Sequence, residues 1–204
     1  MHWSDMPGSA PNNPYCIVSG SYQTRNSGEV VRVDEAVLDE TSGWCAFDTL
    51  PLMRGTTNLN LGESTKYPSQ AYLKNHYGVT SYSYNPYELS EAENNAALNT
   101  VRNAPVDTVT SLSILNVIEH PEERKKHIAL AHSALKPNGT AFFKVFRRNN
   151  TEVSSGSKPE DTECWFQANK PAVRFLDDIA AIFGKDNVCM ADDDIGNTLI
   201  AKKC

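Results

Sequence analysis

Val106-Asp-Thr-Val-Thr-Ser-Leu-Ser-Ile-Leu115 begins the stretch of sequence that decides the fold, and Thr140-Ala-Phe-Phe-Lys-Val-Phe146 ends it. Both segments are mostly apolar or small, as the central strands of a parallel sheet are. Between them, residues 121–135 begin with a proline and repeat apolar residues along one face, which predicts a helix. The stretch therefore predicts a strand–helix–strand unit whose ligand site lies near residues 113–120, at the carboxyl end of the first strand.

The alternation of strands and helices continues on both sides of this unit. Strands are predicted over residues 58–61, 79–84, 188–190 and 198–201, and helices over residues 68–76, 88–101 and 171–183. Asn169 would cap the last helix, and the Pro-Asn-Gly sequence at residues 137–139 predicts a turn. Residues 88–106 leave room for a helix but not for a further strand. The predicted fold class is α/β, with a mainly parallel sheet flanked by helices and closed by an antiparallel hairpin.

The rest of the chain has weaker patterns. Residues 1–28 are rich in Pro, Gly, Ser and Asn and predict an irregular N-terminal arm, which leaves residues 29–204 as a single domain. Residues 29–38 predict a short strand or the start of a helix, and residues 42–52 a helix. Residues 149–161 predict a polar loop.

Composition narrows the classes of function. The 204 residues carry a net charge of −6, and no apolar run approaches the ~20 residues of a membrane helix. We therefore expect a cytoplasmic protein with no membrane partner. The acidic balance argues mildly against tight binding of duplex nucleic acid, and the basic run at residues 124–126 is interpreted as a solvated helix face. The five cysteines have no metal-ligand spacing, so we expect free thiols and no metal site.

Asn60-Leu-Gly62 and Tyr84-Asn85 each stand at the end of a predicted strand, and these two turns resemble the cofactor site of the class I S-adenosylmethionine (SAM) dependent methyltransferases. The first begins Asn60-Leu-Gly62, where the family has an acid, any residue and a glycine-rich turn. The second, Tyr84-Asn85, has an amide where the family has the acid that binds the ribose hydroxyls. The resemblance implies a Rossmann-like class I methyltransferase fold with SAM as cofactor, bound by Asn60, Gly62, Glu63, Ser64, Tyr84, Asn85 and Ser113.

The segment after the central strand strengthens this resemblance. There, Ser113 and Asn116 would line the pocket, and His120 would act as a base, because imidazole titrates near neutrality. The alternative is that Asn116 and His120 only cap the helix that follows. In finer detail, residues 84–87, 115–118 and 165–170 resemble motifs of small methyltransferase-like proteins of phages and mobile elements.

Lys144 lies in a strand that resembles the one carrying the catalytic lysine of the RNA 2′-O-ribose methyltransferases. A lysine there would lower the pKa of an acceptor hydroxyl. Those enzymes also have an aspartate after the central strand, where this chain has serines and Asn116. The alternative is a lysine at a strand end whose ammonium group extends outwards to solvent.

These patterns leave three functions open. The first is SAM-dependent methyl transfer to a nucleic acid or small-molecule acceptor, with Asn116, His120 and Lys144 as the catalytic residues. The second is a catalytically decayed methyltransferase fold that serves as a binding or scaffold subunit with a protein partner, because Asn60 and Asn85 occupy both acid positions. The third is RNA 2′-O-ribose methylation.

Overall fold

The computed structural model of the chain divides into two compact units, Met1–Val106 and Asp107–Cys204. The structure describes residues 22–24, 30–32, 56–62, 70–112, 114–145, 153–157, 164–168, 170–191 and 198–204. The helix predicted over residues 42–52 and the Asn169 cap lie outside these ranges.

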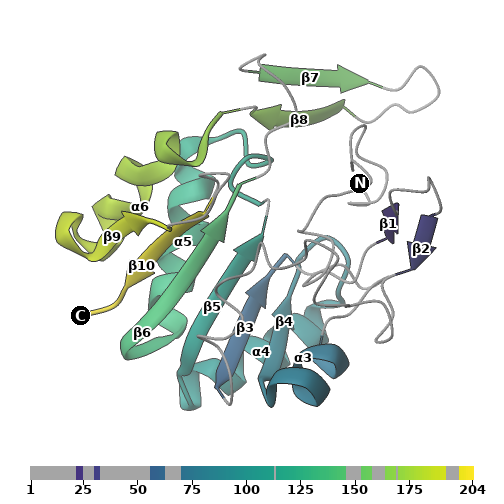
Figure 1. Ribbon diagram of the computed structural model, residues 1–204, viewed down its shortest axis with the longest axis vertical. Helices are drawn as coiled ribbons and strands as arrows, with labels where there is room; N and C mark the ends of the chain where they lie inside the picture. Colours follow the sequence, from purple (N-terminus) through teal and green to yellow (C-terminus); the bar gives the residue numbers. More distant parts are fainter. Residues whose placement is uncertain are drawn as a thin grey trace. The chain divides into compact units, whose positions relative to one another are not determined.

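Six strands form one sheet, in the order β4-β3-β5-β6-β10-β9 (Figure 1). Strands β3 and β4 run parallel, whereas β10 is antiparallel to both β6 and β9. The α/β fold class with its closing antiparallel hairpin is therefore confirmed. The strands are β3 (Thr57–Leu61), β4 (Thr80–Tyr84), β5 (Val106–Leu112), β6 (Leu135–Lys144), β9 (Val188–Met190) and β10 (Thr198–Lys202).

In the first unit, helix α3 (Gln70–Tyr77) connects β3 to β4, and helix α4 (Glu91–Asn103) follows β4. The second helix starts later than predicted because Ser90 caps it. The Ser90 hydroxyl accepts the backbone N–H of Glu93, whose carboxylate accepts the backbone N–H of Ser90 in return. As predicted, α4 leads into β5 without a further strand. The buried apolar side chains here are Leu59, Leu61, Leu73, Val79, Val101 and Val106.

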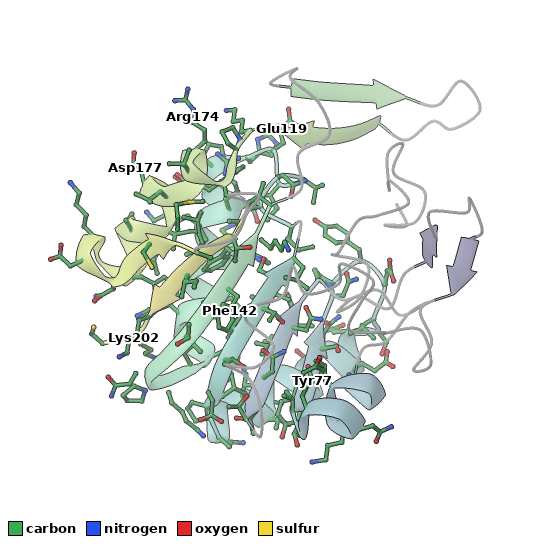
Figure 2. All side chains as sticks on the ribbon, in the orientation of Figure 1. Tyr77, Glu119, Phe142, Arg174, Asp177 and Lys202 are labelled. Atoms are coloured by element: carbon green, nitrogen blue, oxygen red, sulfur yellow. The ribbon has the colours of Figure 1, made fainter. Side chains whose placement is uncertain are left out.

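The second unit contains the predicted strand–helix–strand, with helix α5 (Pro121–Ala134) between β5 and β6. The helix predicted over residues 171–183 is divided into a 3-10 helix, η3 (Ala172–Phe175), and α6 (Leu176–Phe183). Helix α6 packs against α5, β9 and β10. Figure 2 shows Phe142 on the sheet, where it is buried, and Arg174 and Asp177 at the exposed surface of η3 and α6.

The turn predicted at residues 137–139 is wrong, because these residues lie within β6. The chain bends there without leaving the sheet: Asn138 has φ 64°, and its backbone N–H donates to the carbonyl of Lys203 over 2.7 Å. Gly139 is required at this bend, since a Cβ atom would lie 2.9 Å from the carbonyl oxygen of Lys136 and 3.0 Å from that of Asp107. Pairing with the chain's last residues thus keeps a turn-like sequence in a strand.

Among the described residues, two hairpins lie outside the six-stranded sheet. Strand β1 (Tyr22–Thr24) pairs antiparallel with β2 (Val30–Arg32), and β7 (Val153–Ser157) pairs antiparallel with β8 (Cys164–Ala168). Thus the segment expected to be irregular contains β1, and the polar loop predicted over residues 149–161 contains β7. The Val-Ser-Ser-Gly-Ser sequence of β7 carries little strand propensity, so its pairing partner decides its conformation.

Candidate active site

The sharp turn expected at Gly62 closes the carboxyl end of β3. Gly62 has φ 93°, a conformation that side chains with a Cβ atom rarely adopt, and its backbone N–H donates to the carbonyl of Tyr84 over 2.7 Å. The parallel register pairs Leu61 with Tyr84, so β3 and β4 end side by side. The two predicted cofactor turns therefore start from the same edge of the first unit. Glu63 and Ser64 lie outside the described residues.

Asn60 brings a buried amide to this edge. Its side chain is 2% exposed, and its Nδ2 has no hydrogen-bond acceptor within the described ranges. Asn58, two residues earlier on the same face of β3, donates its own Nδ2 to Ser81 Oγ over 3.1 Å. A buried polar group left without a partner costs about 1–3 kcal/mol. Within the part of the chain that the structure describes, Asn60 thus offers an unused donor two residues before Gly62.

Asn85 directly follows β4, at the predicted position, but its carboxamide takes part in a turn. Its Oδ1 accepts the backbone N–H of Tyr87 over 3.0 Å. Asn94 on α4 accepts the backbone N–H of Asn85 over 2.8 Å and donates to its backbone carbonyl over 3.1 Å. The side chain at position 85 is thereby held in one place, and Tyr87 is 93% exposed beside it.

In the second unit, Asn116 lies in a turn after β5, where the backbone N–H of Val117 donates to the carbonyl of Ile114 over 3.0 Å. Its side chain is fully buried, and neither Nδ2 nor Oδ1 has a hydrogen-bond partner in the described part of the chain. Asn116 therefore does not cap the next helix by any described contact. It provides one donor group and one acceptor at the carboxyl end of β5. Ser113 lies outside the described residues.

His120 occupies the N-cap position of α5, where its backbone, and not its side chain, forms the hydrogen bonds to the helix. Its carbonyl accepts the backbone N–H groups of Glu123 and Arg124, both over 3.1 Å, and its side chain makes no capping hydrogen bond. The side chain is exposed. The imidazole is thus accessible to solvent and to a proton donor.

Lys144 ends β6 and is 2% exposed, with the buried Thr198 as its neighbour across the antiparallel pair. The alternative interpretation, in which this lysine extends outwards to solvent, is therefore wrong. Burying a lysine is costly unless its charged group is paired and hydrogen-bonded. The strand-end position alone did not reveal this burial.

Sequence patterns missed the role of Arg124, which was assigned to a solvated helix face. Its side chain is 17% exposed, and Nη1 donates to the carbonyls of Ile118 over 2.8 Å and of Glu119 over 2.9 Å. Its Nε forms an ion pair with Asp178 on α6 over 3.2 Å. Arg124 thus holds the end of the segment that contains Asn116.

A second missed contact joins β5 to α5. Ser111 Oγ and His127 Nε2 are 2.8 Å apart, and Ser111 is fully buried. Burial lowers the pKa of His127 to about 4, so this imidazole is neutral at physiological pH. The contact is a neutral hydrogen bond between the end of β5 and helix α5.

Two further findings concern metal ions and membranes. Within the described ranges, no group of three or more His, Cys, Asp or Glu side chains could hold a metal ion. No helix in the described part of the chain is long and apolar enough to cross a membrane.

Comparison with known proteins concerns the fold. No protein-family model and no curated protein matches the sequence. The sugar N-methyltransferase KedS8 of a Streptoalloteichus species is similar, with a TM-score of 0.50 and 13% identity, over 84% of this chain and 88% of that one. The SAM-bound amino pentose methyltransferase CalS10 of Micromonospora echinaspora gives a TM-score of 0.48 and 13% identity, over 78% and 90% of the two chains. The strand order and the first of these likenesses show that the chain has the Rossmann-like class I methyltransferase fold.

Proposed function

We propose that the protein is a SAM-dependent methyltransferase that acts on a nucleic acid or small-molecule acceptor. One observation carries the proposal: the left-handed Gly62 turn follows Asn60, whose buried Nδ2 has no partner among the described residues, at the edge where β3 and β4 end. Open α/β sheets bind ligands outside the carboxyl ends of their strands. An unpaired buried donor at that place is explained by a ligand that accepts its hydrogen bond.

The residues of this edge suit the proposed cofactor. Gly62 has no side chain to hinder a ligand's approach to the backbone, and Asn60 would donate to an oxygen of the cofactor's carboxylate. Asn85 would contact the ribose hydroxyls through its carboxamide, more weakly than a carboxylate would. Glu63, Ser64, Tyr84 and Ser113 remain predicted cofactor contacts. When bound, SAM supplies a methyl group on a positively charged sulfur.

The groups assigned to the acceptor are Asn116, His120 and Lys144, all of the second unit. The amide of Asn116 would hold an acceptor that has both a hydrogen-bond donor and an acceptor atom, because its own two polar atoms are unpaired among the described residues. His120 is exposed and would remove a proton, while the buried Lys144 would favour the deprotonated form of a hydroxyl. Methyl transfer needs little further chemistry from the protein, and holding the reactants in place contributes most.

Calorimetric titration with SAM and with S-adenosylhomocysteine tests the proposal directly. We expect dissociation constants of roughly micromolar size. Gly62→Ala should weaken binding because its φ of 93° strains an alanine, and Asn60→Leu should weaken it by removing the donor. The exposed Asn95 of α4 offers the matched control, since Asn95→Ala should bind like the wild type. No heat and no thermal shift at roughly millimolar ligand would refute cofactor binding.

A decayed methyltransferase fold that acts as a binding subunit is the second candidate. The specific observation in its favour is that Asn85 is uncharged and spends its Oδ1 on the Tyr87 backbone. Tyr87 is 93% exposed and would then serve as a contact for a protein partner. This candidate predicts no SAM binding, and Tyr87→Ala should abolish partner binding while leaving thermal stability unchanged.

RNA 2′-O-ribose methylation is a narrower form of the first candidate. The burial of Lys144 favours a functional lysine over a solvated one. Transfer of a labelled methyl group to RNA, but not to RNA with blocked 2′-hydroxyls, would support it. If Lys144→Met retains full transfer to RNA, the lysine has no catalytic role.

A further inference from the structure

The side chain of Asn94, on helix α4, forms hydrogen bonds to the turn between β4 and α4. It is 7% exposed, and its side-chain oxygen accepts the backbone N–H of Asn85 over 2.8 Å. Its Nδ2 donates to two backbone carbonyls, of Asn85 and of Leu89, each over 3.1 Å. Three hydrogen bonds from one amide therefore hold both ends of the turn between residues 85 and 89.

The start of α4 does not need this amide. Ser90 and Glu93 already cap the helix with a reciprocal pair of hydrogen bonds. The contacts of Asn94 are therefore additional to helix initiation. They act on the backbone of Asn85, the residue to which the proposed function assigns the ribose hydroxyls.

The turn transmits this restraint to the side chain of Asn85. With its backbone N–H and carbonyl both held by Asn94, Asn85 accepts the N–H of Tyr87 on Oδ1 over 3.0 Å. Backbone conformation restricts which side-chain rotamers are allowed, so fixing residue 85 at two points also restricts its carboxamide. A neutral amide needs such preorganisation more than a carboxylate does, because its hydrogen bonds are weaker.

We infer that Asn94 is a positioning residue for nucleoside binding, which acts through Asn85 and orients its carboxamide toward the ribose hydroxyls of the ligand. This inference rests on the proposed cofactor binding. Asn94 itself would not touch the ligand, because its amide bonds the backbone of Asn85 and Leu89. Its removal should therefore affect only those ligands that use Asn85.

The test compares two ligands, S-adenosylhomocysteine and its 2′,3′-dideoxy analogue, by calorimetric titration of the full chain. Asn94→Ala should weaken binding of S-adenosylhomocysteine about tenfold, the size of one hydrogen bond, and should leave binding of the dideoxy analogue unchanged. In a chain that already carries Asn85→Ala, adding Asn94→Ala should cause no further loss. Asn95→Ala, on the exposed face of the same helix, is the control and should change neither affinity.

Asn94→Asp provides a second variant, which keeps the oxygen that accepts the Asn85 N–H but loses both donors. It serves if the alanine variant fails to fold, and it should show the same selective loss. Equal weakening of both ligands, or additive losses in the double variant, would mean that Asn94 is only structural and would overturn the inference. Wild-type protein that binds neither ligand would instead refute the proposed function itself.

Discussion

The neutral His127 makes the stability of this fold sensitive to acid. Its Nε2 lies 2.8 Å from the buried Ser111 Oγ, and burial lowers its pKa from 6.5 to about 4. A histidine whose pKa is lower in the folded than in the unfolded state binds its proton more weakly when the protein is folded. The folded state is therefore more stable when this histidine is neutral than when acid protonates it. That contribution is complete above pH 6.5, the unfolded value, and is lost as the pH falls toward about 4.

The magnitude follows from the size of the shift. One pKa unit corresponds to about 1.36 kcal/mol, so the gap between 6.5 and about 4 corresponds to about 3 kcal/mol. Most of this free energy is lost as the pH falls between the two pKa values. Acidification from about pH 7 to about pH 4.5 should therefore remove about 2 kcal/mol of the free energy of unfolding. A domain of ordinary stability has only about 5–15 kcal/mol in total.

Urea unfolding at several pH values measures this loss. His127→Gln keeps hydrogen-bonding atoms near Ser111 but does not titrate, so the difference between wild type and variant isolates the imidazole from the carboxylates. We expect the wild type to lose about 2 kcal/mol more than the variant between about pH 7 and about pH 4.5. His120→Gln is the matched control, because that histidine is exposed. Superimposable pH profiles for wild type and His127→Gln would refute the reasoning.

Three further predictions concern stability and loop order. Asn116→Leu should raise the free energy of unfolding, measured with urea, by about 1–3 kcal/mol, because it removes a fully buried amide whose polar atoms are unpaired among the described residues. A loss of stability would contradict this prediction. Arg124→Lys should speed amide hydrogen exchange across residues 114–119, because a lysine loses the hydrogen bonds to the carbonyls of Ile118 and Glu119. Asp178→Asn, the control, should change exchange there less; equal effects would assign the restraint to the ion pair between Arg124 and Asp178. Gly139→Ala should lower the melting temperature, because its Cβ would lie 2.9–3.0 Å from two carbonyl oxygens, and an unchanged melting temperature would show that the bend relaxes.

Much of the fold could be predicted because its signals are local. Runs of apolar residues over β5 and the second half of β6, proline at the start of α5 and Gly184 after α6 each report on their immediate neighbours along the chain. Strand β7 and the bend at Asn138 were missed because each depends on a partner outside its own segment. Strand β7 pairs with β8, and Asn138 bonds to Lys203, which is far away in sequence; the pattern within one segment records neither partner.

For the candidate site, the sequence alone determined which side chains lie at the strand ends. Asn60 lies in the end of β3 and Gly62 follows it, Asn85 follows β4, and Asn116 comes after β5. Only the tertiary structure decided how each is used, because hydrogen-bond partners and burial depend on atoms brought together by folding. It buries Lys144, commits the oxygen of Asn85 to the turn held by Asn94, and leaves the amide of Asn116 unpaired among the described residues. A strand end specifies where a polar group lies, whereas the surrounding packing determines whether that group is satisfied, exposed or available to a ligand.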